Sequence, residues 1–328
     1  MAGWTLVRDV CVIGLGLIGG SLLRAAHSIG RTTFGATTSE ADADAASRAG
    51  FDVTTQVEAA LSKAAERDAM IVLAVPLPAV EEVLRTVSRV AGHCVLTDVT
   101  SVKGPVLDSV RRRAPYAKFV GGHPMAGTAN SGWKASDPAL FDGAAWVLGV
   151  EHDTDLTAWA EVARLVLDLG AHVVPLPADS HDETVARISH LPHIFAAILA
   201  TIGAQGGPLA MALAAGSYTD GTRVAGSSPA LVRAMTEGNR DALLPIVDEA
   251  LGRLGAARGS LASTGGLAVT VNAGNEGAQA FASAKDAERA GVRVSLTAPD
   301  ARDGLIALGE RGGRITAIDG DTAIGDVS

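Results

Sequence analysis

The chain has 328 residues, a length that favours two domains over one. Charged residues make up 19% and hydrophobic residues 48% of the sequence, which is typical of a folded globular protein and excludes a disordered chain. The formal net charge is −9 and the only basic run, Arg111 to Arg113, lies at an expected helix end, so we expect no nucleic-acid partner.

Short apolar runs alternate with helical patterns through the first half. Strands are expected at residues 10–13, 32–37, 69–75, 94–99 and 118–121, with helices at 21–29, 79–90 and 105–113. This alternation predicts a parallel sheet covered by helices on both faces. A helix at 156–169 and a strand at 171–176 follow, and Pro175, Pro177 and Asp179 mark the end of this domain.

The second half is predicted to be almost entirely helical. Ser180 and Glu183 have capping-box spacing and are expected to open a helix, which Pro192 should kink or restart. Helical patterns continue to about residue 254, with Pro229 and Pro245 at expected helix starts. Because an Ala-rich helical domain can bury its apolar surface against a copy of itself, we expect a homodimer.

The last segment is rich in Gly, Ser and Ala, and two strands at 292–296 and 314–318 are expected to flank a short helix. We therefore divide the chain into a dinucleotide-binding domain at 1–178, a helical substrate and dimerisation domain at 179–285, and a short C-terminal extension at 286–328 without an assigned role. The extension is too short for an amino-acid-sensing regulatory domain of ordinary size.

The sequence predicts a cytoplasmic protein without a metal. Cys11 and Cys94 lie in apolar runs and are expected to be buried, with no disulfide. No basic leader precedes the first strand, so no signal peptide is expected. The longest apolar stretch, 194–215, is interrupted by the polar and helix-breaking run 205–208, which argues against a membrane span.

A glycine-rich loop follows the first strand and opens a helix. It reads Gly14-Leu15-Gly16-Leu17-Ile18-Gly19, the GxGxxG fingerprint of a dinucleotide-binding loop in its proper strand–turn–helix context. The first glycine allows the tight turn, the second lets the backbone approach a pyrophosphate, and the third lets helix and strand pack closely. The amides of the helix N-terminus favour the phosphate charge.

The choice between NAD and NADP stays open in the sequence. An NAD enzyme usually carries an acid at the end of the second strand to bind the ribose 2′-hydroxyl. Here Thr37 and Thr38 occupy that place, no acid occurs before Glu40, and hydroxyls there can bind a 2′-phosphate. Val75 and Pro76, where the 69–75 strand ends, complete the expected cofactor site.

Two later loops carry polar residues where strands of the expected sheet end. Asp98 to Gly104 contains Ser101, and Gly121 to Gly127 contains His123. Ligands of open α/β sheets bind beyond the carboxyl ends of the strands, so both loops point toward the nicotinamide. A histidine there can act as a base near neutral pH, although His123 and Ser101 taken singly also fit loop and turn roles.

The segments GLGLIGGS, DVTSVKG, GGHPMAGT, HDETVARISHLPH and TRVAGSSP, in this order, resemble the prephenate/arogenate dehydrogenases. The resemblance covers about residues 9 to 255. It implies a Rossmann-type α/β dinucleotide-binding domain followed by an all-α dimerisation domain, with the active site in the cleft between them. The implied reaction is the NAD(P)-dependent oxidative decarboxylation of prephenate, or of arogenate, on the route to tyrosine.

The resemblance also assigns roles. It implies that His123 is the catalytic acceptor for the ring hydroxyl, that Ser101 hydrogen-bonds both, and that Lys103 is a basic residue beside the substrate. It places three further substrate-binding residues in the helical domain, namely His193, Arg223 on the ring carboxylate, and Ser227. We expect His123 and Arg223 to face one shared cleft; His181 and His190 also fit helix-face or packing roles and are left out of the catalytic set.

Two departures leave the substrate open. Residues 218–221 before Thr222 and Arg223, and Leu231 to Arg233 after the Ser-x-Pro segment, differ from what many family members carry. The alternatives are an arogenate dehydrogenase, another hydroxyacid dehydrogenase, or a nucleotide sensor without turnover. Hydroxyacid dehydrogenases of this build use a lysine of the helical domain, and none occurs between Lys134 and Lys285. A sensor has no need of a hydride-transfer base.

Overall fold

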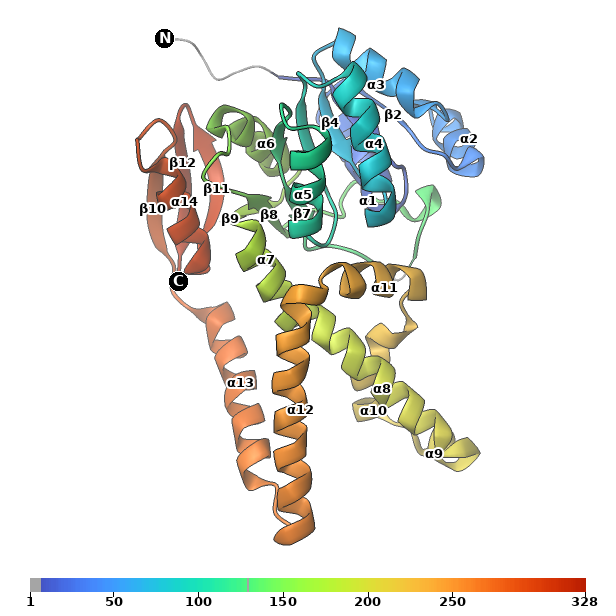
Figure 1. The fold of residues 1–328 in the computed structure, drawn as a ribbon, viewed down its shortest axis with the longest axis vertical. Helices are drawn as coiled ribbons and strands as arrows, with labels where there is room; N and C mark the ends of the chain where they lie inside the picture. Colours follow the sequence, from blue (N-terminus) through green and yellow to red (C-terminus); the bar gives the residue numbers. More distant parts are fainter. Residues whose placement is uncertain (1–6, 129) are drawn as a thin grey trace.

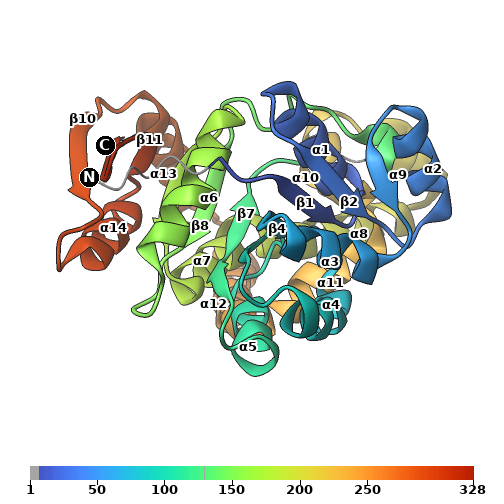
Figure 2. The ribbon, with the colours of Figure 1, turned by 90° about the horizontal axis from the view of Figure 1, so that it is seen from above.

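A computed structural model describes residues 7–128 and 130–328 (Figure 1). The first sheet has six parallel strands in the order β3-β2-β1-β4-β5-β6. Three of them, β1, β2 and β4, are labelled in Figure 2. The strands are β1 Val10–Ile13, β2 Thr33–Ala36, β3 Asp52–Thr54, β4 Met70–Leu73, β5 Val95–Asp98 and β6 Lys118–Val120. Every residue of β1, β2, β4 and β5 is buried, as expected for strands covered on both faces. The predicted Rossmann-type α/β domain is therefore confirmed.

Five helices connect these strands. They are α1 Leu17–Ser28, α2 Glu40–Arg48, α3 Val57–Glu66, α4 Leu77–Val90 and α5 Gly104–Arg113. In α4, Val80, Leu84 and Val87 lie at helical spacing and are buried against the sheet. The first helix begins at Leu17, four residues before the predicted start, because Gly16 already serves as its N-cap. Leu17 and Ile18 thus belong to its first turn.

A second six-stranded sheet, order β10-β12-β11-β9-β8-β7, lies beside the first. β7 Gly122–Pro124, β8 Ala145–Gly149 and β9 His172–Leu176 come from the first half, where η1 Trp133–Ala135 and α6 Leu156–Asp168 also lie. β10 Ala290–Ser295, α14 Ala301–Glu310, β11 Arg314–Asp319 and β12 Thr322–Val327 come from the end of the chain. The pairing of Ile315 with Val173 joins the two groups. The segment at 286–328 therefore extends a sheet of the first domain.

The helical half starts with one long helical run (Figure 1). α7 Ala178–Val185 passes through a π-helical turn, η2 Ala186–His190, into α8 Leu191–Gln205. Pro192 lies just after this turn, so its expected disturbance of the helix is confirmed. The helices that follow are α9 Gly207–Leu213, α10 Gly216–Thr222, η3 Arg223–Gly226, α11 Pro229–Gly238, α12 Arg240–Ser263 and α13 Ala268–Asp286.

Two predicted helix starts are wrong. α7 begins at Ala178 with Pro177 as its N-cap, and the Ser180 hydroxyl contacts Glu310 at 3.5 Å instead of capping the helix. Pro229 does open α11, but Pro245 lies inside α12. That proline is only the sixth residue of its helix, where few backbone bonds precede it.

The run Ala178–Gln205 is long and apolar enough, by length and composition, to cross a membrane, and 22% of its most apolar window is buried. Its exposed apolar residues include Phe195, Ile198 and Ile202. The same run carries buried polar groups, His181, Asp182 and His190, at its N-terminal end. An apolar surface next to buried polar residues is also what a helix at a subunit interface presents.

Candidate active site

The loop between β1 and α1 has the shape that a dinucleotide needs. Gly14 has φ +100°, and a Cβ there would lie 2.4 Å from the carbonyl oxygen of Ala74. A Cβ on Gly19 would lie 1.9 Å from the Gly14 oxygen, so helix and loop touch. A Cβ on Gly16 would meet nothing within 4 Å. The loop is thus closed against the protein at its two ends and open at Gly16, where a pyrophosphate would approach.

The other expected cofactor residues lie where neighbouring strands end. Thr37 follows β2 and is buried, whereas Thr38 is exposed. Ser39 is committed to α2, since its hydroxyl accepts from the Asp42 amide at 3.2 Å. Half-buried Val75 and exposed Pro76, the N-cap of α4, follow β4. These residues fit a nicotinamide dinucleotide. No acidic residue lies between the end of β2 and Glu40, the first residue of α2.

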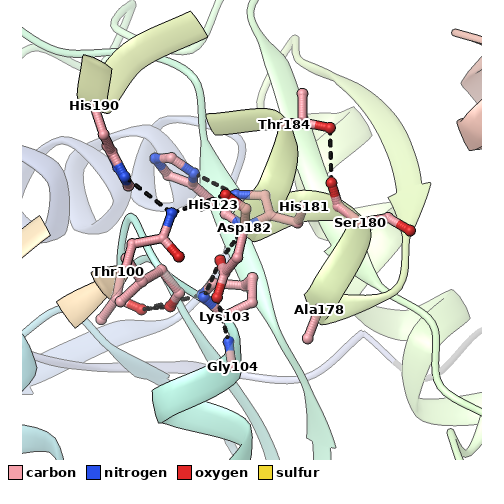
Figure 3. A network of polar contacts seen from close by, with 12 residues as sticks. Thr100, Lys103, Gly104, His123, Ala178, Ser180, His181, Asp182, Thr184 and His190 are labelled. Carbon is pink, nitrogen blue, oxygen red and sulfur yellow. Dashed lines mark hydrogen bonds and ion pairs between the residues drawn. The ribbon is translucent and has the colours of Figure 1, made fainter. Parts of the chain in front are cut away.

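His123 lies in β7, paired with Val147 of β8, and its side chain points toward α7 (Figure 3). Its Nδ1 is 2.8 Å from Nε2 of His181. The Nδ1 of His181 in turn is 2.7 Å from Oδ1 of Asp182. The Asp182 carboxylate also accepts the backbone N–H groups of Lys103 and Gly104, each at 2.8 Å. One continuous chain of contacts therefore runs from β7 through α7 to the start of α5.

Burial and hydrogen bonds determine the protonation of His123, His181 and Asp182. The pKa of His123 lies well below its usual range, chiefly because burial disfavours the charged ring and then because His181 and Lys103 are close. Burial likewise lowers the pKa of His181, against the effect of Asp182. Burial acts to raise the pKa of Asp182, but hydrogen bonds from His181, Lys103 and Gly104 hold it below its ordinary value. At neutral pH the two rings are neutral and the carboxylate is ionised.

Lys103 is not placed as the sequence suggests. Only 3% of it is exposed, and its ammonium contacts Asp98, Thr100 Oγ1 at 3.1 Å and the Gly122 oxygen at 2.6 Å. An ammonium has three protons, so these acceptors leave none for a substrate. Burial lowers the pKa of Lys103, although Asp98 opposes this. The side chain instead fastens the β5–α5 loop to β7, directly before His123.

A second histidine, His190, which was left out of the catalytic set on sequence grounds, also joins the site. Asn239, which ends α11, donates from Nδ2 to the Asp182 carbonyl at 2.8 Å and lies 3.0 Å from Nδ1 of His190. Burial lowers the pKa of His190 to about 4. His181, Asp182 and Asn239 were thus missed as site residues; the available signal was the adjacent His-Asp pair near the start of the first helix of the helical domain.

The remaining predicted residues lie apart from this chain of contacts. Ser101 is half-buried in the β5–α5 loop. His193, in the first turn of α8, bonds the Ser189 oxygen at 2.8 Å. Arg223 is the exposed first residue of η3, which packs against α8, and Ser227 caps the end of η3. Within residues 7–128 and 130–328, no hydrogen bond joins any of these four to His123.

The shared cleft of His123 and Arg223 stays a prediction. A cavity of about 310 Å³ lies among α5, β6 and the loop after β8. Lys103, Phe119 and Glu151 are in its lining, but His123 and Arg223 are not. A second, of about 570 Å³, lies around His93 and Tyr116, away from both. Of the expected site residues only Lys103 lines either cavity, and neither cavity includes His123 or Arg223.

Comparison with known proteins gives two matches to family profiles. Residues 20–175 match "Prephenate dehydrogenase, nucleotide-binding domain", and residues 177–264 match "Prephenate dehydrogenase, dimerization domain". The boundary between the two matches falls beside the predicted one, at the start of α7. The first profile begins just after the glycine loop, so the loop's geometry is an observation separate from the match.

Three relatives place the chain further. A prephenate dehydrogenase of Bacillus subtilis is 34% identical over 73% of this chain, which spans 66% of that relative's length. A solved structure from Corynebacterium glutamicum, provisionally described as a prephenate dehydrogenase, is 43% identical with a TM-score of 0.88, over 94% of this chain and 98% of that one.

The third relative is the prephenate dehydrogenase of Aquifex aeolicus, solved with hydroxyphenyl propionate and NAD+. It has a TM-score of 0.75 at 23% identity, over 84% of this chain and 99% of that one. This likeness supports the shared fold. The profiles, the Corynebacterium relative and the site together lead to one assignment: the chain belongs to the prephenate dehydrogenase family, a family of enzymes with a nucleotide-binding and a dimerisation domain.

Proposed function

We propose that this protein oxidises prephenate with a nicotinamide dinucleotide and releases carbon dioxide, giving 4-hydroxyphenylpyruvate for tyrosine biosynthesis. The observation that carries the proposal is His123, a half-buried imidazole held neutral beyond the carboxyl edge of a sheet with an open dinucleotide loop. A neutral histidine at that edge is a base placed where a nicotinamide would end.

The proposed chemistry uses few protein groups. The bound oxidised nicotinamide supplies the hydride acceptor for the ring carbon that bears the hydroxyl. His123 takes the hydroxyl proton as the C–O bond becomes a carbonyl. The bond to the ring carboxylate then breaks, its electron pair restores the aromatic ring, and His123 returns the proton to the phenolic oxygen. The net products are the aromatic keto acid, carbon dioxide and the reduced cofactor.

Arg223 is assigned to hold the ring carboxylate, with His193 and Ser227 beside it. A guanidinium suits a planar carboxylate because it can bind both oxygens. That carboxylate loses its charge as it departs, so tight pairing cannot lower the barrier to decarboxylation. Arg223 therefore binds and orients the substrate. The exposed position of Arg223 leaves its N–H groups accessible.

Lys103 keeps a supporting place in this proposal. Its three contacts fix the loop that carries Ser101 with respect to β7. Ser101 is assigned to the substrate hydroxyl and His123, with which it shares the carboxyl edge of the first sheet. The choice between NAD and NADP depends on Thr37 and Thr38, whose hydroxyls can bind either the ribose 2′-hydroxyl of NAD or the 2′-phosphate of NADP.

The experiment is an absorbance assay at 340 nm with prephenate or arogenate and with NAD+ or NADP+, all pairs at equal concentration. Turnover of prephenate supports the proposal. Turnover of arogenate alone gives the alternative, tyrosine formed directly, which the altered residues 218–221 keep open. Reaction with a simple hydroxyacid alone, or nucleotide binding without any turnover, contradicts both.

We further propose a cytoplasmic homodimer in which the exposed apolar face of α8 is covered by the second copy. Ile198 and Ile202 are 50% and 62% exposed. Sedimentation equilibrium at micromolar concentration is expected to give a dimer, and Ile202→Asp a monomer. Ile29→Asp, at a 42% exposed position of the first domain, is the matched control and should stay dimeric. A monomeric wild-type protein contradicts the proposal.

A further inference from the structure

The contacts of His123 contain information about which of its nitrogens can act as the base. A neutral imidazole carries one N–H, and its position follows from the partner of each nitrogen. Nδ1 of His123 faces Nε2 of His181, so one of these two atoms must donate and the other accept. The second contact of His181 decides between these possibilities.

Asp182 determines the direction of the two hydrogen bonds that link it through His181 to His123. Its ionised carboxylate can only accept, so Nδ1 of His181 is the donor to Oδ1. The neutral ring of His181 then has an unprotonated Nε2, which accepts from His123. His123 therefore carries its proton on Nδ1, and its Nε2 keeps a free lone pair.

The Asp182 carboxylate, which sets these hydrogen-bond directions, cannot rotate freely. Oδ1 accepts the Lys103 amide and Oδ2 the Gly104 amide, so both oxygens are fixed at the start of α5. Asn239 holds the backbone carbonyl of the same residue. The charged or titratable groups around His123 are His181, Asp182, Lys103 with its partner Asp98, and His190. Asp182 is the acceptor that meets the imidazole pair directly.

We propose that His181 and Asp182 are positioning residues that set the tautomer of His123 and direct its Nε2 lone pair toward the substrate hydroxyl. The proposal rests on the function proposed above. As His123 takes the proton, its Nδ1–H bond to His181 becomes charge-assisted and the nearby Asp182 charge stabilises the imidazolium. In the other tautomer Nε2 would already carry a proton and could not accept one.

The test separates this role from simple packing. Imidazole ¹⁵N spectra of the full-length protein at pH 7.5 report which nitrogen is protonated, with the His123 signals assigned from a His123→Gln spectrum. The wild type is expected to show an unprotonated Nε2 at His123. His181→Phe keeps the ring volume but removes the acceptor, so His123 should become a mixture of tautomers. Its kcat should fall about 10- to 100-fold with KM nearly unchanged.

Two variants make the result specific. His181→Gln can accept from His123 through its amide oxygen and should restore the tautomer and part of kcat. His172→Phe, at a half-buried histidine of β9, is the matched control and should change neither. The proposal is overturned if a folded His181→Phe, or His181→Leu should the first not fold, keeps the wild-type tautomer and kcat, or if wild-type His123 carries its proton on Nε2.

The spectra also separate this inference from the proposed function. If neither prephenate nor arogenate is turned over, the function fails, while the tautomer shift in His181→Phe still supports the hydrogen-bond order. If turnover is found but the tautomer does not depend on residue 181, the function stands and the positioning role fails.

Discussion

The ammonium of Lys103 and the carboxylate of Asp98 form an ion pair that is almost completely removed from solvent, with 3% and 0% of their side chains exposed. Asp98 also accepts from the Gly122 amide at 2.9 Å, one residue before His123. The pair therefore joins the end of β5 to the start of β7. Its position makes Lys103 a structural support for the base.

Lys103→Met is consequently expected to destabilise the protein by about 3–5 kcal/mol, because the buried Asp98 charge loses its partner. Urea unfolding of both proteins measures the difference. Lys118→Met, at a side chain that is 53% exposed, is the control and should cost less than about 1 kcal/mol. Adding Asp98→Asn to Lys103→Met should recover part of the loss. Equal stability of Lys103→Met and the wild type would contradict the support role.

His123→Asn is expected to lower kcat by about 10²–10⁴-fold with a modest change in KM, since it removes the base but little substrate binding. Initial rates at 340 nm over a range of prephenate concentrations give both constants. Nucleotide binding followed by fluorescence should be unchanged. A variant that mainly raises KM would mean that His123 binds substrate and does not act as the base.

Arg223→Ala should show the opposite pattern, with KM raised about 10-fold or more and kcat changed little, because the guanidinium binds a group that leaves uncharged. Arg223→Lys should recover only part of the affinity, since an ammonium cannot bind both oxygens in a planar fork. Arg112→Ala, at an exposed arginine near the end of α5, is the control. A large fall in kcat alone would refute the assignment.

Gly16→Ala tests the open position in the glycine loop. The new methyl group meets no protein atom within 4 Å, so the melting temperature should not fall, but the methyl would occupy the approach of the pyrophosphate. Nucleotide Kd, measured by titration, should rise about 10-fold or more. Gly252→Ala, also free of neighbours but in α12, should leave the Kd unchanged. Unchanged Kd in Gly16→Ala would place the dinucleotide elsewhere.

Acid is expected to destabilise the fold through its buried histidines. His190 has a folded pKa of about 4, while an unfolded histidine titrates near 6.5. Between these values the unfolded chain binds more protons, so the free energy of unfolding falls as the pH falls, by about 1–2 kcal/mol at pH 5 for this one group. The lowered pKa values of His123 and His181 act in the same direction.

Urea midpoints at pH 7 and pH 5 measure this dependence. His190→Gln can still accept from Asn239 and should lose less stability between the two pH values than the wild type does. His152→Gln, at an exposed histidine, should behave as the wild type. A midpoint that is higher at pH 5 than at pH 7 would reverse the expected sign.

Much of the first domain could be predicted because its signals are local. The runs at 10–13 and 94–99 are apolar over the length of a buried strand, and the spacing of the glycines at 14, 16 and 19 predicts a tight turn. The observed helix starts differ from the predicted ones where the N-cap residue was not recognised, as at Gly16 before α1 and Pro177 before α7. The pairing of β11 with β9 joins residues far apart in sequence, and no local pattern predicts such a partner.

The site was predictable in part for the same reason. His123 could be found because it lies in the GGHPMAGT segment that resembles the family motif, whereas the importance of His181 depends on which residue lies 2.8 Å away. Lys103 was predicted as a residue beside the substrate because the DVTSVKG segment resembles the family motif. Its actual partners, Thr100, Gly122 and Asp98, become visible only once β5 and β7 are placed together.

The return of the chain to the second sheet constrains how the molecule can open and close. The helical half is tied to the other half at two places, by Pro177 before α7 and by the segment between α13 and β10 (Figure 1). A part attached at one point can rotate about that point in any direction. Two attachments to the same body restrict the part to rotation about the line between them. Entry and release of ligands should therefore proceed by a small, one-axis movement, and cutting either attachment alone would make that movement wider without separating the two halves.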